Sequence, residues 1–322
     1  MPTIKDVAKK ANVSVATVSR VINNTGYVNI ETKKMVKNVI DDLGYIPNEL
    51  ARSLFLKKSN IIGLIVPHIS TYFFAELIEA IEEASNARGY KLMIFNSRDD
   101  IEIEKKYLNI FTQYNIDGII LVVNTNSAQE YLKLKTPLIT IDHIFSNDVP
   151  SITSDNVLGG RLAAQKLVSA GATKIIHFRG PSVLMTVIDR SKGFYDVMKD
   201  NNIFVESFDL DFKNPDLKDI EAFIKTHIDV DGIFCSSDII AINVNKVLTR
   251  LGKRIPEDVQ VIGFDNIELC ALLNPSLTTI AQPIHDIGNL AIDSLISLIE
   301  KKELNQMHTL VPVHLIERDS TK

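Results

Sequence analysis

Residues 3–22 read TIKDVAKKANVSVATVSRVI, and this stretch decides the fold of the first part of the chain. Apolar residues recur at helical spacing after Thr3, and Thr3 followed three residues later by Asp6 approximates a capping box, so we expect a helix to begin there. Only a short turn separates this helix from Ser14, whose hydroxyl can cap a second helix. Two short helices joined by about three residues form a helix-turn-helix unit.

The second helix of this unit has an outer face suited to DNA. Stepping about 100° per residue groups Val18, Val21 and Ile22 on the inner face and places Ala16 and Arg20 on the opposite side. An ordinary helical hairpin is the alternative, but small residues beside a single arginine favour close approach to base edges in a groove. In this part of the chain we expect DNA contacts from Thr3, Ser14, Val15, Ala16, Thr17, Ser19, Arg20, Asn23 and Tyr45.

The sequence predicts a third helix after this unit and a possible short fourth one. Asn29 can cap a third helix after the NNTGYV turn at residues 23–28, and Gly44 can end it. The next segment, residues 47–54, starts with Pro47, which suits the first position of a helix. About two helical turns are marginal alone in water, so this segment is either an incidental linker or a helix that needs a partner.

Three separated motifs resemble the LacI family of bacterial repressors. They are TIKDVAKKANVSVATVSRVIN at residues 3–23, GYIPNELARSL at residues 44–54 and VIGFDN at residues 261–266. The resemblance implies that residues 47–56 form a hinge helix, ordered when it pairs with its twin on DNA, with Leu54 wedged between base steps in the minor groove. It also implies a homodimer on a pseudo-palindromic double-stranded operator, with hinge contacts from Asn48, Ala51, Arg52 and Leu54.

Composition places the chain among soluble globular proteins. Its 322 residues suit two or three domains, and 45% of them are hydrophobic while 23% are charged. It contains no run of about 18 apolar residues, and a polar amphipathic helix stands where a signal peptide would be expected. Cys235 and Cys270 are too few for a disulfide framework and are expected in the core. We therefore expect a cytoplasmic protein with no membrane partner.

From residue 61 onward, short apolar runs alternate with helical segments, as in doubly wound parallel sheets. Two series of such units predict two similar lobes, and the resemblance implies a periplasmic-binding-protein architecture in which three crossings, near residues 154–159, 282–287 and 312–315, join the lobes. The fold class is thus α/β, a two-lobed body with a small all-α helix-turn-helix domain. The predicted strands cover residues 61–66, 91–95, 118–123, 138–141, 174–178, 232–235 and 260–264.

The charge distribution separates the two parts of the chain. Residues 1–60 contain ten Lys and Arg against five Asp and Glu, a net charge of +5, which leaves −10 on the rest. A basic head on an acidic body suits nucleic-acid binding at one end, although a solvated mixture of charges would look similar. We expect a DNA-binding domain at residues 1–58, with the hinge at about 47–56, and an effector-binding and dimerisation domain at 59–322. Lobe 1 is expected at about 60–156 and 284–312, and lobe 2 at about 157–283 and 313–322.

Two acids mark a ligand site in the body. Asp142 and Asp265 each directly follow a predicted strand, and ligands of open α/β sheets sit at the carboxyl ends of strands. Carboxylates there can accept hydrogen bonds from vicinal hydroxyls, Arg190 can supply donors, and aromatic rings can stack on a sugar. Taken singly, such an Asp is as often a helix cap. The resemblance favours the set Thr71, Phe73, Phe74, Asp142, His143, Ser154, Arg190, Ser237, Phe264, Asp265 and Gln282 as effector-binding residues.

The resemblance leaves two alternatives for the identity of the effector, a ribose-type and a sucrose-type sugar. Thr71, His143 and Ser237 depart from the residues that ribose-responsive relatives carry at these positions, whereas the segments NNTGYV, FAELIE and SDNVLGGRLAAQKLV look more like sucrose-operon repressors. The resemblance therefore implies a sugar-operon repressor with a sucrose-type or ribose-type effector. A catabolite-control regulator that uses a phosphocarrier protein as corepressor remains the alternative.

Other classes of function find less support in the sequence. It contains no dinucleotide, Walker A, nucleophile-elbow or zincin motif, and its seven histidines show no metal-ligand spacing. We therefore expect no catalytic residue, cofactor or metal. Asp142 and Asp265 could form a glycosidase pair, but nothing in the sequence fixes the distance between the two carboxyls or raises the pKa of one of them. A secreted sugar-binding protein would not carry the DNA-binding head.

Overall fold

A computed structural model describes residues 2–46, 58–122, 131 and 134–322, and the chain forms two compact units, Met1–Asn60 and Ile61–Lys322. The hinge helix expected over residues 47–56, with its predicted DNA contacts Asn48, Ala51, Arg52 and Leu54, lies outside the described residues. The domain boundary between residues 58 and 59 therefore remains a proposal.

The first unit contains the three predicted helices, α1 (Ile4–Lys10), α2 (Val15–Asn23) and α3 (Ile30–Leu43). Thr3 and Asp6 form the reciprocal capping box, and the Ser14 hydroxyl accepts a hydrogen bond from the Thr17 amide at 3.1 Å. The third helix ends at Gly44, which has a left-handed φ of 58°. The core of this unit consists of Val7, Ala8, Ala11, Val18, Val21, Val36 and Val39.

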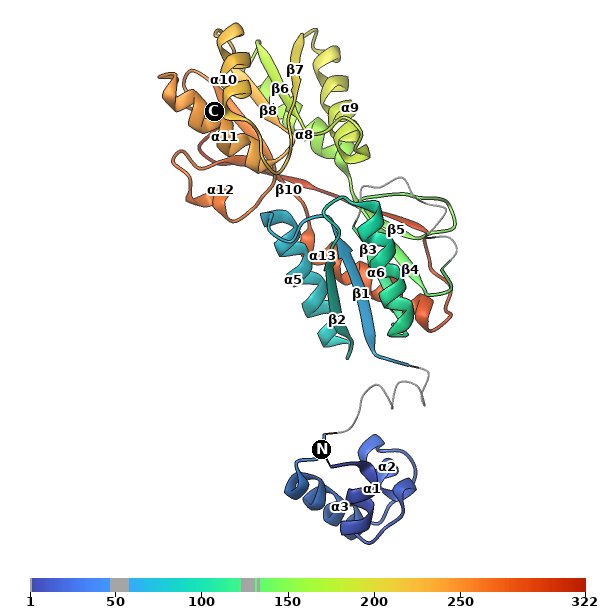
Figure 1. The fold of residues 1–322 in the computed structure, drawn as a ribbon. Helices are drawn as coiled ribbons and strands as arrows, with labels where there is room; N and C mark the ends of the chain where they lie inside the picture. Colours follow the sequence, from blue (N-terminus) through green and yellow to red (C-terminus); the bar gives the residue numbers. More distant parts are fainter. Residues whose placement is uncertain (1, 47–57, 123–130, 132–133) are drawn as a thin grey trace. The chain divides into compact units, whose positions relative to one another are not determined.

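The second unit contains two sheets with matching topology (Figure 1). Their strand orders are β11-β5-β4-β3-β1-β2 in the sheet that we call A and β12-β10-β9-β8-β6-β7 in sheet B. The pairing is parallel except between β10 and β12. Sheet A comprises β1 (Ile61–Val66), β2 (Lys91–Asn96), β3 (Gly118–Leu121), β4 (Leu138–Ile141), β5 (Ser151–Ser154) and β11 (His308–Val311). Sheet B comprises β6 (Ile175–Arg179), β7 (Val205–Asp209), β8 (Gly232–Cys235), β9 (Gln260–Asp265), β10 (Thr278–Ala281) and β12 (His314–Ile316).

Helices cover both faces of each sheet, which explains why the predicted strands are continuous apolar runs. In β1, Ile62 and Leu64 pack toward α5 and α13, whereas Ile65 packs toward α6 on the other face. Sheet B is covered in the same way, by α8 and α9 on one face and by α10 and α11 on the other. The bounds are α5 (Tyr72–Ala87), α6 (Ile101–Gln113), α8 (Asn156–Ser169), α9 (Met185–Asp200), α10 (Leu217–Thr226), α11 (Asp238–Arg250), α12 (Leu269–Leu272) and α13 (Ile284–Ile299). The predicted two-lobed, doubly wound α/β body is confirmed.

The chain passes three times between the sheets. It leaves sheet A after Ser154, returns after Ala281 with α13, and leaves again after Val311. Because the two strand orders match, β4 in sheet A corresponds to β9 in sheet B. Asp142, which directly follows β4, and Asp265, the last residue of β9, therefore stand at the ends of equivalent strands of the two lobes.

Candidate functional site

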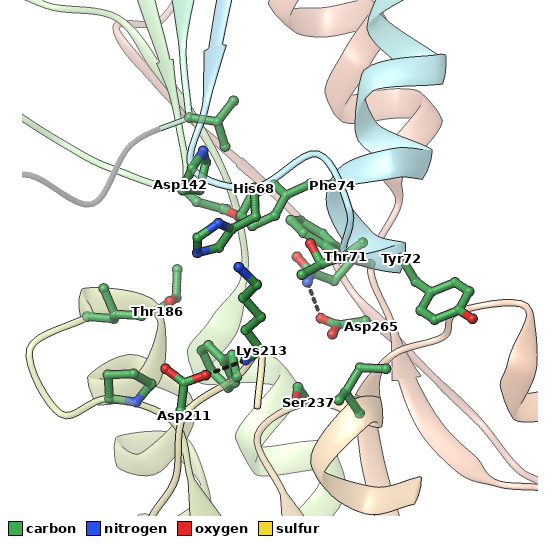
Figure 2. Close-up of a pocket in the computed structure, with 18 of the residues that line it drawn as sticks. His68, Thr71, Tyr72, Phe74, Asp142, Thr186, Asp211, Lys213, Ser237 and Asp265 are labelled. Carbon is green, nitrogen blue, oxygen red and sulfur yellow. Dashed lines mark hydrogen bonds between the residues drawn. The ribbon is translucent and has the colours of Figure 1, made fainter. Parts of the chain in front are cut away.

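A cavity of about 380 Å3 lies at the carboxyl ends of the strands of both sheets. Residues that follow β1, β2 and β4 form its sheet A wall, and residues that follow β6, β7, β8 and β9 form its sheet B wall. Figure 2 shows His68 and Asp142 facing Asp211 and Lys213 across this space. The cavity is thus built by both lobes, and a molecule inside it can contact both.

The two acids at the ends of β4 and β9 both line this cavity. Both have a positive φ, 58° at Asp142, in the left-handed region that aspartate tolerates, and 122° at Asp265, in a region that residues other than glycine seldom adopt. Burial raises the pKa of both carboxyls, that of Asp265 to about 8, although the charge of Arg190 acts in the opposite direction. Gln282 Nε2 donates to Asp265 Oδ1 at 2.7 Å. Asp142 Oδ1 is buried and has no hydrogen-bond partner among the described residues, so it is free to accept from a ligand.

Arg190 on α9 is held rigidly at the cavity wall. Its side chain is buried, Nε donates to Asn156 Oδ1 at 2.8 Å, and Nη1 donates to the Ser236 carbonyl at 2.6 Å. The guanidinium carbon lies 3.7 Å above the ring centroid of Phe264. Burial lowers the pKa of Arg190, while Asp265 and Asp142 raise it, so the guanidinium stays charged. These contacts fix its plane and leave Nη2 without a partner among the described side chains.

Aromatic side chains supply the apolar part of the wall. Phe73 and Phe74 lie at the start of α5, with ring centroids 5.2 Å apart in an edge-to-face arrangement. Phe212, from the segment after β7, lines the same cavity. Apolar rings beside a few fixed polar groups are the usual composition of a small-molecule site.

Most of the predicted effector residues meet at this cavity. Those that line it are Thr71, Phe73, Phe74, Asp142, Arg190, Ser237, Asp265 and Gln282.

Three predicted effector residues lie behind the wall instead. Phe264 is fully buried beneath Arg190 and beside Gly159, so it supports the guanidinium and does not offer a stacking face to a ligand. Ser154 is also buried, and its hydroxyl donates to Gln282. The ring of His143 packs against Phe145, with centroids 4.4 Å apart.

Sequence reasoning missed several charged residues of the cavity. His68 pairs with Asp99 at 3.0 Å on the sheet A side, and on the sheet B side the Lys213 amide donates to Asp211 Oδ1 at 2.8 Å. Each of these residues follows a strand, so the strand-end rule would have found them. The strand before Asp211, β7, was itself not predicted.

In the first unit, α2 presents the predicted outer face to solvent. Val15, Ala16 and Arg20 are exposed, whereas Val18 and Val21 are buried in the core. Of the other predicted contacts, Ser14, Thr17, Ser19 and Asn23 lie on α2 or at its cap, Thr3 caps α1, and Tyr45 follows α3. An exposed helix face of small residues with one arginine can approach base edges closely.

Other site types find no basis in the described part of the chain. No group of three or more His, Cys, Asp and Glu side chains there is arranged to hold a metal ion. None of the described helices is both long enough and apolar enough for a bilayer span. Cys235 and Cys270 are buried and free, and burial raises the pKa of both thiols.

Comparison with known proteins matches both units. The family model for bacterial regulatory proteins of the lacI family matches residues 3–48, and the model for a periplasmic binding protein-like domain matches residues 164–321. The chain is 41% identical to the ribose operon repressor of Halalkalibacterium halodurans over all of this chain and 98% of that protein. It is 38% identical to the sucrose operon repressor of Pediococcus pentosaceus over 98% of each chain.

Solved structures agree with these matches. A periplasmic binding protein/LacI transcriptional regulator from Alkaliphilus metalliredigens, complexed with D-xylulofuranose, is 35% identical with a TM-score of 0.76 over 82% of this chain and 99% of that chain. The lac repressor dimer bound to operator and the anti-inducer ONPF is 26% identical with a TM-score of 0.91 over 99% of this chain and 98% of that chain.

Proposed function

The chain belongs to the lacI family of bacterial regulatory proteins, and on that premise we propose that it is a transcriptional repressor of a sugar-utilisation operon. It binds operator DNA through α2 and is controlled by a sugar in the cavity of the second unit. The observation that carries this proposal is the presence, in one chain, of the outward face of α2 and of a cavity lined by two acids and a fixed arginine. Either feature alone fits several classes of protein, and the two together fit a ligand-controlled DNA-binding protein.

The chemistry of the cavity suits a sugar. Asp142 and Asp265 offer oxygens that accept hydrogen bonds from neighbouring hydroxyls, and Arg190 offers N–H donors to ring or hydroxyl oxygens. The rings of Phe73 and Phe74 can cover the C–H face of a sugar. The ribose and sucrose operon repressors among its relatives, and the neighbour bound to D-xylulofuranose, support an effector of the ribose or sucrose type.

The repressor acts in the cytoplasm and binds its operator as a homodimer. The dimer of its operator-bound structural neighbour supports this assembly. Two-fold symmetry of the protein requires two half-sites related by the same axis, so the operator is pseudo-palindromic. A sugar that contacts both walls of the cavity favours one arrangement of the two lobes, and this preference is coupled to DNA affinity through the dimer. No bond is made or broken, and the proposal assigns no catalytic residue or cofactor.

A binding experiment tests the proposal in two steps. Selection from random double-stranded DNA should return a pseudo-palindromic site, and titration with D-ribose, sucrose and their phosphates should then show one that binds and changes the affinity for this site. A protein that selects no DNA sequence would contradict the repressor assignment. A protein that selects a site but responds to no sugar in the panel would contradict the effector assignment only.

Replacement of Arg20 by Ala should relax the selected sequence at one base pair of each half-site. Its exposed guanidinium can bind guanine O6 and N7 together, so its loss should weaken operator binding by about 1–3 kcal/mol. Selection and fluorescence anisotropy with the variant measure the two effects. Lys37→Ala on the exposed face of α3 is the matched loss of a cation and should leave the selected sequence unchanged. A wild-type motif at full strength from the Arg20 variant would show that α2 does not read bases through this residue.

A further inference from the structure

A line of buried hydrogen bonds runs between Arg190 and Asp265, which both line the cavity. Arg190 Nε donates to Asn156 Oδ1 at 2.8 Å, and Asn156 Nδ2 donates to the Ser154 carbonyl at 3.0 Å. The Ser154 hydroxyl donates to Gln282 Oε1 at 2.7 Å, and Gln282 Nε2 donates to Asp265 Oδ1 at 2.7 Å. The five side chains are between 1% and 9% exposed, so water does not compete for these bonds.

The donors of this line all point from Arg190 toward Asp265. The guanidinium of Arg190 can only donate, so Asn156 turns its oxygen toward it and its nitrogen toward the Ser154 carbonyl. Gln282 turns its oxygen toward the Ser154 hydroxyl and its nitrogen toward Asp265 Oδ1. Both amide side chains therefore have a single orientation that satisfies the two groups beside them.

The connecting residues lie where the chain passes between the sheets. Ser154 ends β5 of sheet A, and Asn156 begins α8, which packs on sheet B. Gln282 directly follows β10 of sheet B and precedes α13, which packs on sheet A. Neither Ser154 nor Asn156 lines the cavity. A movement of one lobe against the other therefore acts on the same bonds that orient Arg190 and Asp265.

We propose that Ser154 and Asn156 are positioning residues that hold Arg190 and Asp265 at a fixed separation and link their placement to the arrangement of the two lobes. This inference rests on the proposed function, since it takes Arg190 and Asp265 as the groups that contact the sugar. The two residues act through other side chains and make no contact with the ligand themselves. Loss of the Ser154 hydroxyl removes the donor to Gln282 and so loosens Asp265, whereas loss of the Asn156 side chain removes a partner of Arg190. The two supports meet at the backbone of residue 154, whose carbonyl accepts from Asn156.

Calorimetric titration of the full-length protein with D-ribose and with sucrose tests the assignment. Ser154→Ala should weaken binding of whichever sugar the wild type binds by about tenfold, since Gln282 loses the donor that orients it. Ser151→Ala is the matched control, because Ser151 is a buried serine on the same strand whose hydroxyl contacts His308 Nδ1 at 2.9 Å, away from the cavity. It should lower thermal stability to a similar extent and leave the sugar affinity unchanged.

A double-variant cycle tests whether the two residues support different groups. Ser154→Ala acts on Asp265 and Asn156→Ala acts on Arg190, so their losses of sugar-binding free energy should add in the double variant. Wild-type sugar affinity in either single variant, or a double variant no weaker than the more severe single change, would overturn the proposal. A crystal structure of the sugar-free Asn156→Ala variant gives a second readout, in which Arg190 should leave the face of Phe264. If the wild type binds neither sugar, the effector assignment fails, and this crystal structure still decides whether Asn156 positions Arg190.

Discussion

Replacement of Gly193 by Val is expected to prevent stable folding of the second unit. Helices α8 and α9 touch backbone to backbone, and a Cβ placed at Gly193 would lie 1.9 Å from the Val157 carbonyl oxygen. The reciprocal contact is as close, since a Cβ at Gly160 would lie 1.9 Å from the Arg190 carbonyl oxygen. No flexible side chain can move aside, so the helices themselves must separate. The free energy of unfolding should fall by more than about 4 kcal/mol.

Denaturant unfolding followed by circular dichroism measures this loss. Lys192→Val changes the neighbouring, exposed position of the same helix and should alter the free energy of unfolding by less than about 1 kcal/mol. Gly193→Ala already introduces the clashing Cβ and should also lower the free energy of unfolding by far more than the Lys192 change. A Gly193→Val protein as stable as the Lys192 variant would mean that the two helices do not approach as closely as the structure shows. Because α9 carries Arg190, the same close contact sets the position of the guanidinium at the cavity wall.

The helices of the first unit were predictable because their signals are local. Thr3 and Ser14 were identified as caps from residues within three positions of them, and both caps are present. Gly44 was identified as a stop because a left-handed residue ends many helices, and its φ is left-handed. Such signals need no knowledge of the rest of the fold.

Several strands at or next to the edges of the two sheets were not predicted. The strands β5 (SITS), β7 (VESFD) and β10 (TTIA) are short and partly polar, so they show neither a long apolar run nor a clear alternation. Pairing with neighbouring strands determines them, and pairing is not visible in one sequence. Because β7 was not predicted, Asp211 and Lys213, which follow it, were not considered as cavity residues.

The residues of the candidate site were predictable where their position at the end of a strand was enough. They were not predictable where the direction of the side chain decides whether a residue faces the cavity. Asp142 and Asp265 follow strands, and the strand-end rule is enough to expect them at a cavity. Phe264 directly precedes Asp265, and successive residues of a strand point to opposite faces. One of this pair therefore had to turn away, and Phe264 turns toward Gly159 on α8.

Asp265→Asn is expected to abolish the response to sugar and at the same time to stabilise the free protein. On the proposed function, Asp265 accepts hydrogen bonds from two sugar hydroxyls. Asparagine offers one acceptor and a misplaced amide N–H, so sugar affinity should fall by about 100-fold. Burial raises the pKa of Asp265 to about 8, far above the value of about 4 for an exposed aspartate. Between these values the folded protein binds a proton that the unfolded chain lacks, so stability falls as pH rises from about 4 to about 8. Asparagine carries no charge and removes this penalty.

The gain in stability should therefore depend on pH in a defined direction. Thermal unfolding should show Asp265→Asn more stable than the wild type by at least about 1 kcal/mol at pH 8, with a smaller difference at pH 5. Asp258→Asn is a control of opposite sign, because Arg254 lowers the pKa of Asp258, and its loss should reduce stability at neutral pH and restore equality under strongly acidic conditions. An Asp265 variant that is less stable than the wild type at pH 8 would show that its carboxylate is well compensated by Arg190 in the free protein. A gain in stability together with a loss of sugar binding would instead mean that the charge of Asp265 lowers the stability of the sugar-free protein, and that binding of the sugar offsets this destabilisation.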